Sequence, residues 1–429
     1  MTTGTIESKI DFDQAHVWHP FTSLSEATAP VYVTEAKGVY LHTSDGRSII
    51  DGVSSWWVNL HGHSNPVIAH AIFDQAMKLE HVIFAGFTHE PAITLTQNLL
   101  TVLPSNQHRI FFSDNGSTAV EVAIKMALQY FYNTGRKRKR IIALNGSYHG
   151  DTFGSMSVGE RGTFTKPFQD YLFDVSFIGV PNEHNFEGVL EEFKRHVDEG
   201  DVAAFIYEPL VQGAAGMIMY EAHLFESLLA YASHNDVICI ADEVFTGFGR
   251  TGKWFASEYM DTKPDIIAVS KGITGGTLPL GVTACSKKIA SAFESNNPAH
   301  TFFHGHSYTA NPIACAAANA SFSILKETNT WKNIRRIEES HSTFVKKVAH
   351  HKHVRNVRSI GTILALELEI GDTDYFNDIR KNIYSFFVKR EILLRPLGNI
   401  IYVLPPYVIE EPELKRIYDA IEDFLQELG

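Results

Sequence analysis

The middle of the chain alternates short apolar runs with longer amphipathic stretches. Apolar runs lie at residues 109–114, 140–145, 174–180, 202–210, 237–244 and 265–272, and helical patterns lie at 116–133, 189–197 and 223–235. Strands that alternate with helices predict an α/β fold with a largely parallel sheet covered on both faces. Ligands bind such sheets at the carboxyl ends of the strands, so residues that follow each apolar run are the first candidates for a site.

The two ends of the chain show a different pattern. Residues 32–52 predict short antiparallel strands joined by an Asp-Gly turn, and residues 330–428 alternate charged helices with short strands. This pattern indicates a smaller α+β unit to which both ends contribute. We therefore predict an N-terminal segment of a small domain at 1–55, a large domain at 56–325 and a C-terminal small domain at 326–429.

Composition narrows the possible partners. The chain has 429 residues, of which 44% are hydrophobic and 20% charged, as in ordinary globular proteins. With 37 basic and 49 acidic residues the net charge is −12, which gives no general attraction for nucleic acid or anionic membranes. No signal peptide or membrane-spanning segment is visible. The cysteines Cys239, Cys285 and Cys315 lack CxxC spacing and are typical of reduced, buried thiols, so we expect a cytoplasmic protein.

The 21 histidines raise the question of a metal site. His61 and His63 are close in sequence, and residues 350–353 read His-His-Lys-His. The second group lies at a predicted helix end among charged residues, without an acidic or cysteine partner at ligand spacing. We predict that it lies on the surface and that the chain has no metal site.

Two strand ends carry groups suited to an anion or a ring. Asn115, Gly116 and Ser117 follow the run 109–114 and start a helix, whose free backbone N–H groups bind anions well. The alternative is an ordinary serine-type helix cap. Tyr148 follows the run 140–145 and stands between glycines that let a second ring approach, although an ordinary turn explains this segment equally well.

Two further strand ends carry charges. Asp242 follows an apolar strand directly, where a carboxylate is costly unless a cation meets it, the alternative being a cap on the next turn. Lys271 stands at the tip of another apolar strand, before a glycine-rich exit. Burial lowers the pKa of a lysine and makes its amine a usable nucleophile.

Together these features match the needs of pyridoxal phosphate. This cofactor requires a phosphate cradle, an aromatic face, a carboxylate at the pyridine nitrogen and a lysine for its covalent link. Gly116 with Ser117, Tyr148, Asp242 and Lys271 supply these groups in that order. A nicotinamide-dependent dehydrogenase is disfavoured because the first strand-to-helix turn, SDNGSTAVE, lacks the GxGxxG spacing. A protein that keeps the fold as a non-catalytic scaffold stays open as an alternative.

Several segments resemble the class III aminotransferases, which are fold type I pyridoxal phosphate enzymes. They are DNGSTAVEVAIKMA, NGSYHGDTFG, EPLVQGAAGM, ADEVFTGFGRTG, SKGITGG and HGHSYTANP, so the resemblance covers nearly the whole chain. It implies a large domain with a mostly parallel seven-stranded sheet, and a homodimer whose active sites use both subunits. Within the class, HVWHPFTSL, DGVSSWWVNLHGH and LLRPLGNIIYVLPPY are similar to members that aminate 8-amino-7-oxononanoate in biotin biosynthesis. Another class III ω-aminotransferase, acting on a diamine or a β-amino acid, is the alternative.

The resemblance also implies roles for residues around the cofactor. These are Lys271 as covalent anchor and proton carrier, Asp242 at the pyridine nitrogen, Tyr148 on the ring, Glu208 and Gln212 near the ring hydroxyl, Gly116 and Ser117 at the phosphate, and Ser307 completing the phosphate cradle of the second subunit.

A second group of residues is implied for the substrates. Arg395 would bind a carboxylate through its planar guanidinium, the alternative being a structural salt bridge. Trp56 and Trp57 would form an aromatic wall, although adjacent tryptophans are otherwise core or interface residues. Arg250 and Tyr402 are predicted to contact substrate as well.

The amino donor is less sharply defined by the sequence. Relatives that use S-adenosylmethionine commonly read HPYTS, whereas this chain reads HPFTS and places Phe21 at the tyrosine position. The segment HGHSYTANP is also more similar to relatives that use lysine. The intact surroundings of Phe21, together with the paired tryptophans, favour S-adenosylmethionine, and lysine is the alternative donor.

Overall fold

The computed structural model describes residues 4–25, 29–370 and 379–428. Among these, the largest sheet has seven strands, in the spatial order β4 (Gln107–Ser113), β12 (Gly281–Ser286), β11 (Ile266–Val269), β10 (Ile238–Asp242), β7 (Val202–Tyr207), β5 (Arg140–Leu144) and β6 (Ser176–Ile178). Strand β12 runs antiparallel to both of its neighbours, and the other pairs are parallel. The predicted mostly parallel seven-stranded sheet is confirmed.

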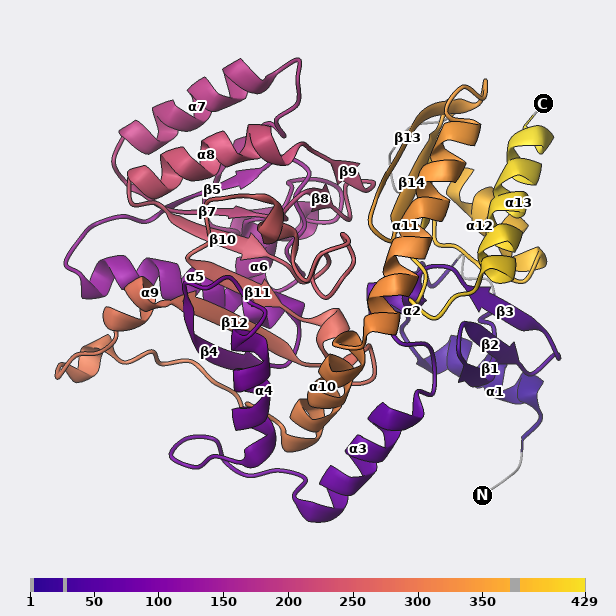
Figure 1. The fold of residues 1–429 in the computed structure, drawn as a ribbon, viewed down its shortest axis with the longest axis horizontal. Helices are drawn as coiled ribbons and strands as arrows, with labels where there is room; N and C mark the ends of the chain where they lie inside the picture. The colour runs from indigo at the N-terminus through magenta and orange to yellow at the C-terminus, as the bar shows by residue number, and fades with distance from the viewer. Residues whose placement is uncertain (1–3, 26–28, 371–378, 429) are drawn as a thin grey trace.

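Helices cover both faces of this sheet (Figure 1). One face packs against α5 (Gly116–Asn133) and α9 (Lys287–Ser291), and the other against α7 (Phe186–Asp198) and α8 (Ala222–His234). The alternation of side chains along a strand explains the two cores. In β10, Ile238 and Ile240 pack on the side of α5, whereas Cys239 and Ala241 pack on the side of α7 and α8.

Three helices extend the large unit away from the sheet (Figure 1). They are α3 (Pro66–Lys78), α4 (Glu90–Leu100) and α10 (Pro312–Leu325). Helices α4 and α10 are joined by a hydrogen bond from Nδ2 of Asn98 to Oδ1 of Asn319 at 2.9 Å. The long helix α11 (Thr328–Val348) then leads into the second unit.

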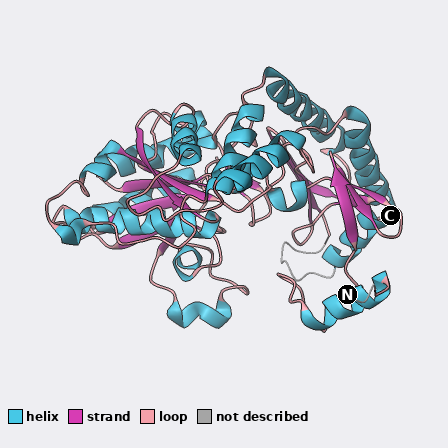
Figure 2. Ribbon diagram, turned by 90° about the horizontal axis from the view of Figure 1, so that it is seen from below, coloured by secondary structure: helices cyan, strands magenta, loops and turns pink. Residues whose placement is uncertain are grey.

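The second unit is built from both ends of the chain. One of its sheets contains β1 (Val33–Lys37), β2 (Tyr40–Thr43), β3 (Ser48–Asp51) and β15 (Ile392–Leu393), and the other contains β13 (Val354–Ile360), β14 (Ile363–Leu368) and β16 (Ile400–Val403). Strands β3 and β15 pair in parallel, so the N-terminal strands and the C-terminal segment share one sheet, a closer association than the packing that the sequence suggested. Figure 2 shows the strands of the molecule gathered in two groups with helices around them.

The remaining helices and strands are short or peripheral. The longer ones are α1 (Ile6–His16), α12 (Ile379–Lys389) and α13 (Glu411–Glu427), and the shorter ones are α2 (Ser54–Trp57), α6 (Phe153–Ser157), β8 (Val211–Gln212), β9 (Ile218–Met219), η1 (Lys166–Tyr171), η2 (Ala256–Tyr259), η3 (Lys271–Thr274) and η4 (Pro298–His300). None of the helices that the structure describes is long and apolar enough to cross a membrane. The domain bounds given by the sequence stay a prediction.

Candidate active site

A cavity of about 430 Å³ opens at the carboxyl ends of the central strands. Its lining comes from the loops after β5, β7, β10 and β11 and from the start of α5. The residues around it are Trp57, Val58, Asn115, Gly116, Ser117, Tyr148, His149, Gly150, Glu208, Ala214, Asp242, Val244, Phe245, Ser270, Lys271, Gly276, Thr277, Leu278, Pro279 and Leu280. The cavity therefore brings together the four strand ends that the sequence singled out.

Lys271 follows β11 and begins η3, with a φ of 45°. Its Nζ atom lies 4.8 Å from the centroid of the Trp57 ring and 5.8 Å from that of Phe245. Burial lowers the pKa of Lys271 to about 8, although the negative charges of Asp242 and Glu208 act in the opposite direction. An amine with this pKa is partly unprotonated near neutral pH and can act as a nucleophile.

Asp242 is the last residue of β10 and is buried. Its Oδ2 atom lies 2.7 Å from Nδ1 of His149, and its Oδ1 atom accepts a hydrogen bond from the backbone N–H of Val244 at 3.0 Å. One oxygen thus caps the next turn, as the alternative had it, while the other pairs with a histidine. The second ring nitrogen of His149, Nε2, is buried and has no hydrogen-bond partner among the described residues.

Glu208 follows β7 and joins two loops of the site. Its Oε1 atom accepts a hydrogen bond from the backbone N–H of Tyr148 at 2.8 Å, and its Oε2 atom accepts one from Gly213 at 2.8 Å. Burial raises the pKa of Glu208 to about 7, with a further upward contribution from Asp242 that the two backbone donors and His149 oppose. Tyr148 is thereby fixed at its backbone, and burial together with Asp151 raises the pKa of its phenol.

Gln212 stands just behind the lining of the cavity. It is fully buried, and its Nε2 atom donates a hydrogen bond to the carbonyl of Asn145 at 2.9 Å. Its Oε1 atom has no hydrogen-bond partner within the described part of the chain. A buried amide oxygen without a donor is costly, so this atom is available to a polar group that enters the site.

The start of α5 has the features of an anion cradle. Asn115 is the helix cap, because its side chain accepts a hydrogen bond from the backbone N–H of Thr118 at 3.0 Å. Ser117 is therefore not the cap, and its Oγ atom instead accepts a hydrogen bond from the N–H of Asp151 at 3.2 Å. Gly150 has a φ of 126°, and a Cβ atom there would collide with Ser117. Glycine is required at this close approach.

These residues fit pyridoxal phosphate. The helix start at Gly116 and Ser117 suits its phosphate, the buried carboxylate of Asp242 suits its pyridine nitrogen, and Lys271 supplies an amine of lowered pKa. Gln212 adds a buried side-chain oxygen without a partner among the described residues, behind the lining. One cavity thus brings together groups suited to the phosphate, the ring and the covalent link of this cofactor.

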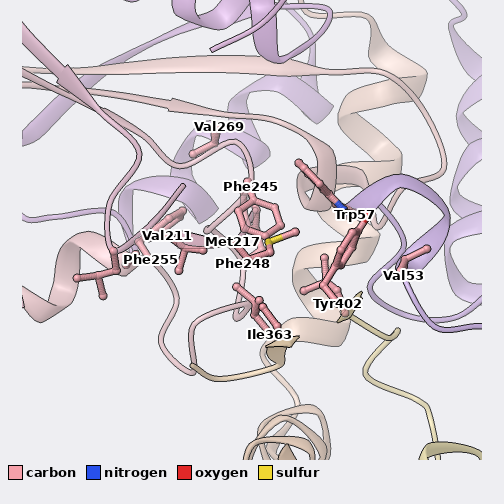
Figure 3. Packing of buried hydrophobic residues seen from close by; sticks show 14 of the residues in the cluster. Val53, Trp57, Val211, Met217, Phe245, Phe248, Phe255, Val269, Ile363 and Tyr402 are labelled. Atoms are coloured by element: carbon pink, nitrogen blue, oxygen red, sulfur yellow. Dashed lines mark hydrogen bonds between the residues drawn. The ribbon is translucent and has the colours of Figure 1, made fainter. Parts of the chain in front are cut away.

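An aromatic group continues the cavity outward. Trp57 lines it and donates a hydrogen bond from Nε1 to the hydroxyl of Tyr402 at 3.0 Å; Figure 3 shows the two rings next to each other. Trp56 is partly exposed, with the guanidinium carbon of Arg395 4.4 Å from its ring centroid. The Phe21 ring meets Trp56 edge-on at a centroid distance of 5.7 Å.

Seven predicted residues are not part of the cavity lining, namely Phe21, Trp56, Gln212, Arg250, Ser307, Arg395 and Tyr402. Arg250 is buried and donates hydrogen bonds to the carbonyls of Pro405 at 3.0 Å and Asn59 at 3.2 Å, which favours a structural role. Tyr402 is buried behind Trp57 and acts on the site through it. Ser307 is exposed and lies outside the cavity of its own chain.

Sequence reasoning missed a role for His149, which directly follows Tyr148 in the segment NGSYHGDTFG. The signal was a histidine in the strand-end loop opposite Asp242, but a contact across 93 positions has no local pattern. Thr277, Leu278 and Pro279 were also missed, and they line the cavity from the loop before β12.

Comparisons with known proteins point to one enzyme family. Residues 22–425 match the family described as Aminotransferase class-III. A curated relative from Synechococcus elongatus, adenosylmethionine-8-amino-7-oxononanoate aminotransferase, is 48% identical over 96% of this chain and 99% of its own length. The crystal structure of the enzyme of the same name from Methanocaldococcus jannaschii superposes with a TM-score of 0.92 at 34% identity, covering 98% of this chain and 99% of that one. A PLP-bound amine transaminase from an uncultivated Pseudomonas species has a TM-score of 0.89 at 29% identity, covering 96% of this chain and 99% of that one.

Proposed function

Because the chain belongs to the class-III aminotransferases and is a pyridoxal-phosphate-dependent enzyme, we propose that it transfers an amino group from S-adenosylmethionine to 8-amino-7-oxononanoate, giving 7,8-diaminononanoate. This is the reaction of biotin biosynthesis for which the Synechococcus and Methanocaldococcus relatives are named. The observation that carries the proposal is the lysine amine 4.8 Å from the centroid of the Trp57 ring, together with the Arg395 guanidinium over the ring of Trp56, the residue before Trp57 in the chain.

The acceptor has a long aliphatic chain with a carboxylate at one end. An aromatic wall suits the chain, and the planar guanidinium of Arg395 suits the carboxylate. Within the described residues no acidic side chain pairs with Arg395, so its charge is available to a ligand. The structural salt bridge that was the alternative for this arginine is therefore not favoured.

When bound, pyridoxal phosphate supplies a ring that withdraws electrons from the substrate and lets a proton leave the carbon next to the nitrogen. Lys271, with a pKa of about 8, can accept that proton and return it at a second carbon. Asp242 would hold its carboxylate toward the pyridine nitrogen, and His149 fixes that carboxylate by a contact of 2.7 Å. Gly116 and Ser117 would hold the phosphate, and Glu208, Gln212 and Tyr148 would contact the ring.

The donor is inferred from the aromatic entrance. S-adenosylmethionine carries a large ring that packs well against Trp56 and Phe21, whose rings are in edge contact. Phe21 has no hydroxyl to offer the donor, and this observation favours lysine as the second candidate. Either donor would leave its amino nitrogen in the site and depart before the acceptor binds. We therefore propose ping-pong kinetics.

We also propose that the enzyme is a homodimer with shared active sites. Ser307 is exposed and outside the cavity of its own chain, next to Phe303 and Tyr308, which are 75% and 66% exposed. Exposed aromatic rings of this kind are typical of surfaces that contact another protein. A second copy would place Ser307 at the phosphate cradle. The free, buried cysteines suit a reducing compartment, so we place the enzyme in the cytoplasm.

Separate half-reactions test the proposal. The cofactor-loaded enzyme is mixed with S-adenosylmethionine or with lysine, and the loss of its yellow absorbance shows which donor leaves nitrogen on the enzyme. 8-Amino-7-oxononanoate is then added, and 7,8-diaminononanoate is measured by mass spectrometry. We expect bleaching by S-adenosylmethionine and product only after the acceptor is added, with Lys271→Ala inactive in both steps. Negligible turnover of 8-amino-7-oxononanoate, with active turnover of a diamine or a β-amino acid, would contradict the proposal.

A further inference from the structure

The backbone that carries the two tryptophans has an unusual conformation. Ser54, Ser55 and Trp57 have φ angles of 53°, 61° and 68°. Side-chain-bearing residues rarely adopt positive φ, and glycine is the usual choice at such positions. Three such residues within four positions require surrounding contacts that hold them there. We call residues 54–57 the wall segment.

Asp51 supplies these contacts from the N-terminal side. It is the last residue of β3 and is fully buried. Its carboxylate accepts hydrogen bonds from the backbone N–H of Val53 at 3.2 Å, from the N–H of Ser55 at 2.8 and 2.7 Å, and from the Ser55 hydroxyl at 3.1 Å. Ser55 is thus held at its backbone and at its side chain by one carboxylate.

His63 completes the arrangement. Its Nε2 atom lies 2.9 Å from Oδ2 of Asp51, with 15% of the histidine side chain and none of the aspartate side chain exposed. The backbone of His63 is itself fixed, since its N–H donates to the carbonyl of Gly38 at 2.7 Å. The histidine thereby orients a buried carboxylate whose other donors are backbone N–H groups and the Ser55 hydroxyl.

The first and last residues of the wall segment are held by other groups. The hydroxyl of Ser54 donates to the carbonyl of Leu404 at 2.7 Å, and Arg250 donates to the carbonyl of Trp57 at 3.4 Å. Among these contacts, those of Asp51 hold Ser55, the residue directly before Trp56. If Ser55 relaxed to an ordinary φ, the side chains that follow it would point elsewhere.

We propose that Asp51, oriented by His63, is a positioning residue that fixes Trp56 and Trp57 for substrate binding. Asp51 does not line the cavity, so it acts through the wall segment and not on the reacting atoms. The inference rests on the proposed function only in taking the two tryptophans as the wall that contacts substrates.

The variant Asp51→Asn tests this role. Asparagine keeps the shape of the side chain, but its amide nitrogen cannot accept hydrogen bonds from Ser55 or from a donating His63. We expect the KM for donor and acceptor to rise about tenfold, with kcat changed less than about threefold, because the lost interaction serves ground state and transition state alike. The dissociation constant of pyridoxal phosphate, measured by absorbance titration of the cofactor-free protein, stays within about threefold of wild type.

Glu226→Gln is the matched control. Glu226 also accepts hydrogen bonds from backbone N–H groups and a hydroxyl, namely those of Asp261 and Thr262, but it lies outside the cavity. We expect this variant to lower the melting temperature without changing KM. His63→Gln, which leaves the bonds between Asp51 and Ser55 in place, should raise KM by a smaller factor than Asp51→Asn.

The proposal is overturned if folded Asp51→Asn protein has the KM of wild type. It is also overturned if the variant loses kcat and cofactor affinity along with the rise in KM. If neither Asp51→Asn nor His63→Gln folds, Asp51 is a purely structural residue and the proposal is also overturned. All ratios are taken against wild type with whichever donor and acceptor wild type uses. Failure on 8-amino-7-oxononanoate would thus count against the proposed function alone.

Discussion

Single buried charges define the centre of the site. Asp242 and Lys271 could be predicted from the sequence because a charge at the end of an apolar strand is costly without a purpose. The pairing of Asp242 with His149 could not, since the fold alone brings these residues together. Arg250 differs: the family resemblance implied substrate contact, whereas its Nη1 and Nη2 groups donate to backbone carbonyls that no linear pattern reveals, so substrate contact stays a prediction.

The lowered pKa of Lys271 leads to a pH prediction. At pH 7.5 a group of pKa about 8 is about one quarter unprotonated, against about one in a thousand for an ordinary lysine. Only the unprotonated amine captures an aldehyde, so the capture rate of pyridoxal phosphate by cofactor-free protein should rise with pH and level off above about 8. Stopped-flow absorbance measures this rate.

A free lysine derivative in solution is the control for that measurement. Its capture rate should continue to rise toward pH 10, because the pKa of its amine is the ordinary one. A protein rate that also rises to pH 10 would show that burial does not lower the pKa of Lys271.

The lowered pKa of Lys271 also affects stability. Because the unfolded chain binds the proton of this lysine more tightly, the contribution of Lys271 to the free energy of unfolding should increase as the pH rises from about 8 to 10.5.

At the scale of elements, the sequence predicted long amphipathic units best. Helix α5 has the predicted bounds, because its buried positions repeat with helical spacing between a polar start and Asn133. Strand β12 was not predicted, since four of its six residues are Gly, Ala, Cys and Ser, which give a weak strand signal. It is nevertheless fully buried, because it fills the position between β4 and β11 in the sheet.

The start of α5 gives a prediction at this scale. Asn115→Ala removes the side chain that caps Thr118 and should cost about 1 kcal/mol in the free energy of unfolding, measured in urea with cofactor-free protein. Because Gly116 and Ser117 follow directly, the variant should also weaken cofactor binding. Asn65→Ala is the control, since Asn65 caps α3 outside the cavity. It should lose similar stability and keep its cofactor affinity, and equal affinity in both variants would contradict the proposed cradle.

At the scale of the whole molecule, the N-terminal and C-terminal parts of the chain share one sheet, and Ser307, a residue of the proposed site, is exposed. The sequence could predict only that the N-terminal strands pack with the C-terminal unit. It could not predict that β3 pairs with β15, because the partner and register of a strand depend on the complete fold. A partner subunit leaves even less trace in one sequence. Ser307 illustrates this, since its own chain leaves it exposed outside the cavity, and only in the proposed dimer would a second copy bring its hydroxyl to a site.

Subunit complementation tests this arrangement. In the proposed dimer each site combines Lys271 of one subunit with Ser307 of the other. Lys271→Ala should be inactive because it lacks the amine, and Ser307→Glu should be nearly inactive because its carboxylate repels the phosphate. Dimers that contain one chain of each kind then have one intact site, and random pairing of equal amounts makes half of all dimers hybrid.

The co-expressed mixture should therefore recover about a quarter of wild-type activity, measured as amino transfer per mole of chain. A site formed within one chain predicts no recovery, because each chain carries one defect. Analytical ultracentrifugation of both single variants provides the control, because activity is recovered only if each variant still forms dimers. Full activity of Ser307→Glu alone would show that Ser307 does not hold the phosphate, whereas recovery in the mixture requires that the two residues come from different subunits.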